Sequence, residues 1–265
     1  MNAKPTGGDA AVRRILVALN AVSDSRAAIE RAAAMAAEHE AELAGLFVED
    51  LDLLRLCELP GHEVVLTTGA ARPTDRREME RQLRARAETA KRVLERIAAA
   101  HHLRWSFEVR RARMLNAVRE AAELADVVAA DMTGPGRIER PDLRPAVLAY
   151  FEGGPSSARV LGLAVRAAVQ HDAPLSVLLP ARDAAAAAAG YARVRELLRH
   201  HEVEVTLERL QPGAAALRRR LAGRGTPLLF MEAAGRLIAG GALPDIVSAT
   251  GCEVILVSGG RQPEG

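Results

Sequence analysis

The sequence predicts an α/β protein made of two tandem repeats, each a doubly wound parallel sheet. Short apolar runs bounded by turn residues alternate with longer stretches of helical periodicity, and this order of elements occurs twice. Apolar runs of this length are typical of parallel strands that are buried on both faces. We assign residues 12–132 to a first domain and 145–259 to a second, joined by a segment rich in glycine, proline and charge.

The first repeat opens with a strand, a helix and a second strand. Residues 15–19 and 43–48 are the apolar runs, and residues 25–40 between them carry alanine and isoleucine at helical spacing. A long amphipathic helix then covers residues 75–100. A strand at 105–109, a helix at 115–124 and a strand at 127–130 complete the assignment, so we expect this repeat to lack its last helix and strand.

The second repeat follows the same order and is longer by one helix and one strand. Its strands are expected at residues 147–151, 175–179, 203–207, 228–231 and 254–257. Its helices are expected at residues 157–170, 184–200, 214–221 and near 244–250.

Composition excludes several classes of function. The formal net charge is only +2 and aromatic residues make up 3%, which disfavours a nucleic-acid-binding surface. Arg218, Arg219, Arg220 and Arg224 lie close together, but a solvated helix end explains them as well. No apolar run is long enough to span a membrane, and residues 1–9 lack the apolar core of a signal peptide. We therefore expect a cytoplasmic protein.

Neither cysteine nor histidine forms an obvious metal or redox site. Cys57 and Cys252 are far apart and neither belongs to a CxxC pair, which favours reduced thiols, and Cys252 opens a buried strand. The histidine pairs at 101–102 and 200–201 close helices, where a cation faces the negative end of the helix dipole. We expect no metal site.

Three stretches resemble the universal stress protein family. They are Arg-Ile-Leu-Val-Ala-Leu-Asn at 14–20, Leu-Ala-Gly-Leu-Phe-Val-Glu-Asp at 43–50 and Cys-Glu-Val-Ile-Leu-Val at 252–257. The resemblance implies tandem α/β domains of the universal stress protein or adenine nucleotide alpha hydrolase-like type, usually dimeric. It also implies that some members bind ATP, through an acidic residue after the first strand and a GxxG motif after the fourth, followed nine residues later by Gly-Ser or Gly-Thr.

The sequence departs from that ATP motif in both halves. Asn20 stands in the first acidic position, and Glu152 stands in the second with a longer side chain. The glycines after the fourth strands are wrongly spaced, and Glu232 would repel a phosphate. The candidate residues of a vestigial pocket are Asn20, Val48, Gly134, Gly136, Glu152, Gly235 and Gly240.

These observations predict a non-catalytic stress-response or regulatory protein that acts on an unknown protein partner, with a homodimer as an open alternative. We expect no cofactor and no ATP. The alternative is a sensor that holds ATP or AMP in its second half, and a further rival is a catalyst on the same scaffold, because a fold does not fix a function.

The segment between Glu49 and Arg77 is too apolar for a plain surface loop. It carries Leu51, Leu53, Leu54, Leu56 and Leu59. We expect these leucines to pack onto the body of the protein, with a subunit contact as the alternative.

Overall fold

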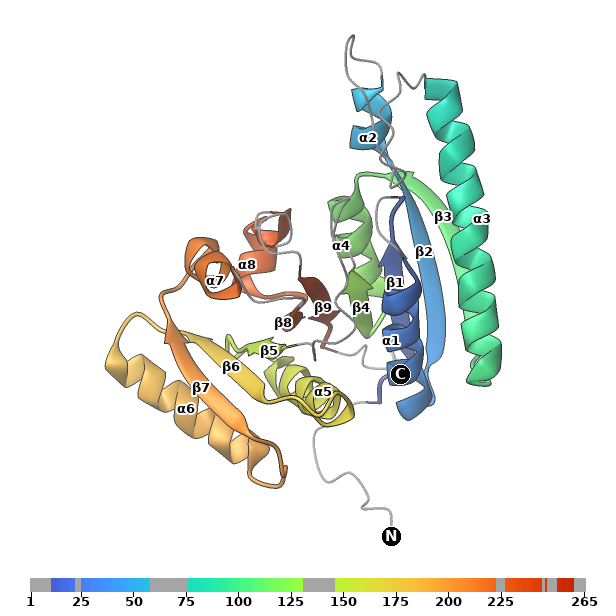
Figure 1. Ribbon diagram of the computed structural model, residues 1–265. Coiled ribbons are helices and arrows are strands. Elements are labelled where there is room, and N and C mark those ends of the chain that lie inside the picture. The colour runs from blue at the N-terminus through green and yellow to red at the C-terminus, as the bar shows by residue number, and fades with distance from the viewer. Residues whose placement is uncertain are drawn as a thin grey trace, which may run out of the picture. The chain divides into compact units, whose positions relative to one another are not determined.

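The computed structural model describes residues 11–21, 25–57, 76–130, 146–222, 227–244, 246 and 252–259. These residues divide into two compact units, which we describe separately. Among them, residues 12–130 belong to the first unit and residues 146–259 to the second. Each unit is a parallel sheet with helices packed against it (Figure 1).

The sheet of the first unit has four described strands in the order β3-β2-β1-β4, all parallel. They are β1 (Arg14–Leu19), β2 (Glu42–Asp50), β3 (Trp105–Ala112) and β4 (Val127–Ala130). The two inner strands β1 and β2 and the short β4 are almost wholly buried, as their continuous apolar sequences predict.

Three long helices cover this sheet: α1 (Ser25–Glu38), α3 (Arg76–Ala100) and α4 (Met114–Leu124). Helices α1 and α3 contact each other on one face, and α4 packs against the other (Figure 1). Right-handed crossovers require this arrangement, because the chain steps from β1 through β2 to β3 in one direction and then returns to β4. The buried stripe of α3 recurs every three or four residues: Met79, Leu83, Ala87, Ala90, Leu94 and Ala98.

The second unit has five described strands in the order β9-β8-β5-β6-β7, again all parallel. They are β5 (Val147–Tyr150), β6 (Leu175–Pro180), β7 (Val205–Leu210), β8 (Leu228–Glu232) and β9 (Glu253–Val257). The helices are α5 (Ser157–Gln170), α6 (Ala184–Leu198), α7 (Ala214–Leu221) and the short α8 (Arg236–Ala239).

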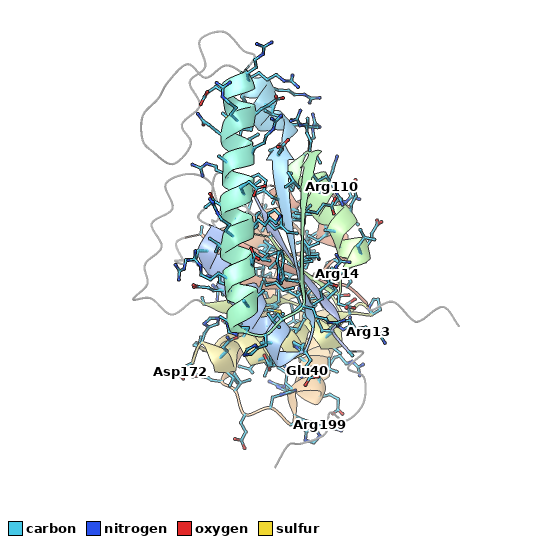
Figure 2. The ribbon with its side chains drawn as sticks, turned by 90° about the vertical axis from the view of Figure 1, so that its right-hand side faces the viewer. Arg13, Arg14, Glu40, Arg110, Asp172 and Arg199 are labelled. Carbon is cyan, nitrogen blue, oxygen red and sulfur yellow. The ribbon has the colours of Figure 1, made fainter. Side chains whose placement is uncertain are left out.

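Both units end their first helix in the same way. Glu40 after α1 and Asp172 after α5 have positive φ angles of 52° and 47° (Figure 2). The next residue donates its backbone N–H back to the helix, Ala41 to Ala36 and Ala173 to Ala168, both at 2.9 Å. This Schellman termination satisfies carbonyl groups that a helix end leaves open.

The sequence predictions fail mainly at element ends and at two short helices. The strand expected at 203–207 lies at Val205–Leu210, and the helix expected to reach residue 200 ends at Leu198. Helix α8 was not predicted, because four residues are too few to show a periodicity. Of the helix expected near 244–250, Pro244 and Ile246 are helical and the other residues lie outside the described ones.

The apolar segment after β2 begins with an unpredicted helix, α2 (Leu51–Leu56), which contacts α3. The carboxylate of Asp50 caps it by accepting the backbone N–H of Asp52 at 2.9 Å. Leu54 is buried, as expected for packing onto the body, but Leu56 is 43% exposed. Leu59 lies outside the described residues.

The two sheet orders place a reversal of direction beside the first strand of each unit. In the second unit the chain leaves β5 toward β6 and later returns to β8 on the other side. In α/β sheets, ligands bind outside the carboxyl ends of the strands at this switch point. The carboxyl ends of β5 and β8 therefore define the candidate site.

Candidate functional site

The switch point of the second unit is occupied by the side chain of Glu232, the last residue of β8. Its carboxylate accepts the backbone N–H groups of Gly154 at 3.1 Å and Ser156 at 3.2 Å. It also accepts the hydroxyl of Ser157, and Glu232 is only 3% exposed. The carboxylate is thus enclosed by three donors from the turn after β5.

These donors lie at the N-terminus of α5. Ser156 is the N-cap residue of that helix and makes no capping hydrogen bond through its own side chain. The first N–H groups of a helix lack partners within the helix and favour a negative charge. Glu232 supplies that charge from within the protein, at a place where other proteins bind a phosphate.

Glu152, which follows β5, makes the reciprocal contact. Its Oε1 lies 3.5 Å from Nε of Arg236, the first residue of α8, which follows β8. The Glu152 side chain is 8% exposed, whereas that of Arg236 is 80% exposed. Glu232, at the end of β8, therefore lies at the start of α5, and Glu152, after β5, lies at the start of α8.

Burial raises the pKa of the Glu152 carboxyl above its ordinary value of 4.5. The guanidinium and backbone N–H of Arg236 act in the opposite direction, while the charge of Glu232 adds to the rise. Burial and the charge of Glu152 also raise the pKa of Tyr150, at the end of β5, to about 12. Burial thus disfavours the ionised forms of Glu152 and Tyr150 in this crevice between the ends of β5 and β8.

Two glycines make room for these carboxylates. A Cβ atom on Gly154 would lie 2.3 Å from Oε2 of Glu232, and one on Gly235 would lie 2.2 Å from Oε2 of Glu152. Gly235, one of the predicted site residues, therefore has the carboxylate of Glu152 as a close neighbour. Gly240 ends α8, is exposed, and would meet only backbone oxygens of its own helix.

Two of the predicted site residues in the first unit lie at the carboxyl edge of its sheet. Leu19 pairs with Phe47, so the next residues, Asn20 and Val48, follow side by side. Asn20 is half-buried and Val48 is fully buried. Gly134 and Gly136 lie outside the described residues.

Sequence reasoning missed two arginines at this edge. Nη1 of Arg86, on α3, donates to the carbonyl of Ala21 at 2.6 Å, and burial lowers the pKa of this guanidinium. Arg111 at the end of β3 lies 2.8 Å from the buried carboxylate of Glu49 and 3.1 Å from Glu80. Nothing in the local sequence marks these contacts, because each joins residues far apart in the chain.

The histidines, cysteines and helices of the described residues bear on the metal, redox and membrane predictions. No group of three His, Cys, Asp or Glu side chains suited to a metal occurs among them. The four paired histidines are exposed, and His102 itself holds a positive φ of 54° after α3. Cys252 is buried and Cys57 half-buried. None of the helices in the described ranges is long and apolar enough to cross a membrane.

Comparison with solved structures identifies relatives of this fold. A universal stress protein from Archaeoglobus fulgidus DSM 4304 aligns at 14% identity and a TM-score of 0.53, over 95% of this chain and 97% of that one. A protein from Pseudomonas aeruginosa UCBPP-PA14, described as a candidate universal stress protein, aligns at 14% identity and a TM-score of 0.46, over 94% of each chain. The cytoplasmic domain of a prokaryotic cation chloride cotransporter aligns at 11% identity and a TM-score of 0.42, over 95% of this chain and 97% of that one.

No protein-family model and no curated protein matches the sequence. The fold rests instead on parallel sheets with the first strand at the centre, on helices covering both faces, and on the alignment with the archaeal protein along nearly the whole of both chains. The chain has the fold of a universal stress protein.

Proposed function

We propose that this chain is a universal stress protein-like regulatory protein of the cytoplasm that acts by contact with a protein partner, without catalysis and without ATP. The observation that carries the proposal is the position of the Glu232 carboxylate, which accepts from Gly154, Ser156 and Ser157. The anion-binding end of α5 is thereby closed by a side chain of the protein.

A nucleotide in this crevice would meet two obstacles. Its phosphates would have to displace Glu232 from three donors, and they would come close to the second carboxylate, Glu152. Like charges in a poorly hydrated crevice repel strongly. Among the described contacts of the two carboxylates there is one guanidinium, that of Arg236 beside Glu152, and a single cation is too little positive charge for a triphosphate.

The same contacts argue against a nucleophilic serine. Ser157 is buried, and its hydroxyl donates to Glu232. A nucleophile must be open to a substrate, and Ser157, although it lies beside a carboxylate, is only 4% exposed. Regulation through a partner, or through a second copy of the chain, therefore accounts better for this crevice than turnover does.

The direct test is binding of phosphate and adenine nucleotides by the protein and by a Glu232→Ala variant. The variant exposes the three donors, so we expect it to gain affinity for inorganic phosphate at the start of α5. Glu232→Gln, which removes the charge and keeps the volume, guards against a variant that fails to fold. Chemical shifts of the Gly154 and Ser156 amides report the site.

The sensor alternative makes the opposite prediction. An adenine nucleotide retained through purification in native mass spectrometry, and lost in a Glu152→Ala variant, would establish nucleotide binding in the crevice and contradict the proposal. Hydrolysis of added ATP that disappears with the same variant would favour an enzyme. Light scattering of the purified chain decides between a monomer and a homodimer.

A further inference from the structure

Strand β3 forms the outer edge of the sheet in the first unit (Figure 1). Among the described strands it pairs with β2 alone, along its whole length. The middle of the strand is open, because Val109 is 46% exposed and the side chain of Glu108 is 59% exposed. The free side of an edge strand presents backbone donors and acceptors to which another strand can pair.

Alternate residues of β3 present their backbone groups to this free side. The carbonyl of Arg104, just before the strand, accepts the N–H of Leu43 in β2 at 2.9 Å and so points toward β2. The backbone groups of successive residues in a strand point to opposite sides. Phe107, Val109 and Arg111 therefore direct both their N–H and C=O groups away from β2.

The side chains on either side of Val109 carry opposite charges. Glu108 and Arg110 are two residues apart, share one face of the sheet and form an ion pair of 2.9 Å within the strand. Arg110 also lies 3.1 Å from Glu120 of α4, which places this pair on the α4 face. Figure 2 looks onto this side of the first unit, where Arg110 is labelled. The edge thus presents one negative and one positive group side by side.

We propose that β3 pairs antiparallel with β3 of a second copy of this chain, about a twofold axis at Val109. This register places Glu108 of each copy directly opposite Arg110 of the other. Phe107, Val109 and Arg111, whose backbone groups point outward, then occupy the hydrogen-bonded positions of the ladder. Glu108 and Arg110 occupy the positions between them, where facing side chains are closest and opposite charges attract.

Other registers of the same strand pair lack this match. An axis at Glu108, Arg110 or Arg111 would place that residue opposite its own copy, and like charges directly opposite each other are destabilising. An axis at Phe107 would place Glu108 opposite Ser106, which offers no positive charge. The charges therefore select the axis at Val109.

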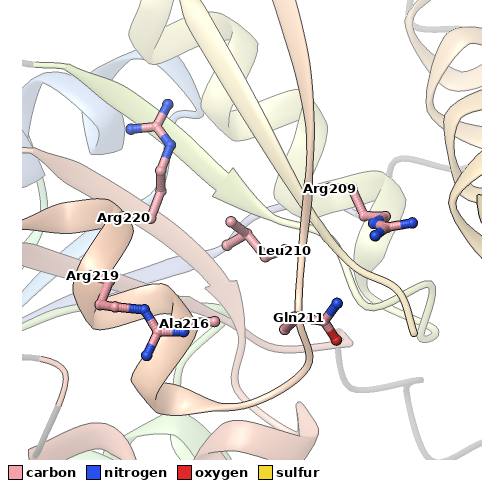
Figure 3. Close-up of a pocket in the computed structure, with 6 residues that line it drawn as sticks. All are labelled: Arg209, Leu210, Gln211, Ala216, Arg219 and Arg220. Atoms are coloured by element: carbon pink, nitrogen blue, oxygen red, sulfur yellow. The ribbon is translucent and has the colours of Figure 1, made fainter. Parts of the chain in front are cut away.

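The edge strand of the second unit, β7, offers no such match. Residues that face each other in a ladder must lie on the same side of their strands. The opposite charges of β7, Glu208 and Arg209, are adjacent in sequence and so lie on opposite sides, as Figure 3 shows for the neighbours Arg209 and Leu210. Both carboxylate oxygens of Glu208 already accept from Arg220 of α7. The reciprocal ion pairs are thus a property of β3.

The test is sedimentation velocity of the full chain over a concentration series, with a dimer as the expected result. Glu108→Arg and Arg110→Glu should each weaken the dimer about tenfold, because each change turns two attractive pairs into two repulsive ones. An equimolar mixture of the two variants should restore association, since every charge then faces its opposite. Arg193→Glu, a charge reversal at an exposed position of α6, is the matched control and should associate as the natural protein does.

A chain that stays monomeric, a dimer that neither reversal weakens, or a mixture that associates no better than each variant alone would overturn the proposal. Circular dichroism checks the fold, and Val109→Pro is a second variant, because proline removes an outward-pointing donor that an edge strand does not need for its own sheet. It should abolish the dimer. The dimer is independent of the crevice, so Glu232→Ala should leave association unchanged whatever its effect on phosphate binding.

Discussion

The carboxylate of Glu232 lies 3.1 Å from the backbone nitrogen of Gly154, a residue 78 positions earlier in the chain. This contact and the two beside it tie the end of β8 to the start of α5. Replacing Glu232 by alanine should lower the free energy of unfolding by roughly 2–3 kcal/mol, because buried donors lose their acceptor. Urea denaturation measures the change.

Two comparisons sharpen that prediction. Glu232→Gln keeps an acceptor oxygen, so its loss should be about half as large. Glu196→Gln, on the exposed face of α6, changes a carboxylate whose partner among the described residues is Arg199, and should alter stability by less than about 0.5 kcal/mol. Equal stability of the Glu232→Ala variant and the natural protein would show that these hydrogen bonds contribute nothing.

Glu152 should make stability depend on pH in a defined direction. Its pKa is raised in the folded protein, so folding favours the protonated carboxyl. Below its ordinary value of 4.5 the group is protonated in the folded and unfolded states and makes no difference. As the pH rises through 4.5 and then through the folded pKa, ionisation in the crevice destabilises the protein.

We therefore expect Glu152→Gln to be more stable than the natural protein at pH 7 and equal to it near pH 4. The lost ion pair matters little, because Arg236 is 80% exposed. Thermal unfolding across this pH range measures the difference. A variant that is less stable at pH 7 would mean that attraction by Arg236 outweighs burial and the charge of Glu232.

Two glycines should respond oppositely to alanine. A Cβ on Gly45, in β2, would lie 2.6 Å from Cδ1 of Leu94 and 2.7 Å from Cδ2 of Phe107, so Gly45→Ala should destabilise by about 1–3 kcal/mol. Gly162, inside α5, has no atom within 4 Å of such a Cβ. Gly162→Ala should stabilise by about 0.5–1 kcal/mol, because alanine favours a helix interior. Denaturant midpoints compare the pair, and a stable Gly45→Ala variant would show that α3 can move away from the sheet.

Arg111 should be needed for stability, because the carboxylate with which it pairs, that of Glu49, is buried. Arg111→Ala leaves the carboxylate of Glu49, whose side chain is 9% exposed, without its closest cation and should cost about 3 kcal/mol. Changing both residues, to Glu49→Gln and Arg111→Met, should recover much of that loss. Arg55→Ala is the control, since its pair with Asp52 is exposed on both sides and should contribute under about 0.5 kcal/mol. A double-mutant cycle by urea denaturation gives the coupling directly.

The strands and long helices could be predicted because their signals are local. Apolar runs such as residues 15–19 and the stripe from Met79 to Ala98 carry the period of the element itself. Helix α2 escaped prediction because its six residues contain one buried side chain, Leu54, and therefore no repeating pattern. A periodic pattern can be recognised in a sequence only when the element is long enough to repeat it.

The crevice was predicted only in part. The sequence placed Glu152 and Gly235 at strand ends and indicated that Glu232 opposes a phosphate. It did not show that Glu232 accepts hydrogen bonds from the start of α5, because its donors, Gly154, Ser156 and Ser157, lie far from it in the sequence. The Gly-Gly-Pro-Ser-Ser run was the available signal, since such residues commonly begin a helix.

The closure of the crevice by one side chain has a genetic consequence. Glutamate and glycine codons differ at a single base, so one nucleotide change at position 232 would replace the occupying carboxylate by a residue with no side chain. A single nucleotide substitution therefore separates a protein with a closed crevice from one with an open crevice. Lineages of this gene can be expected to pass between the two states more readily than the difference in chemistry suggests.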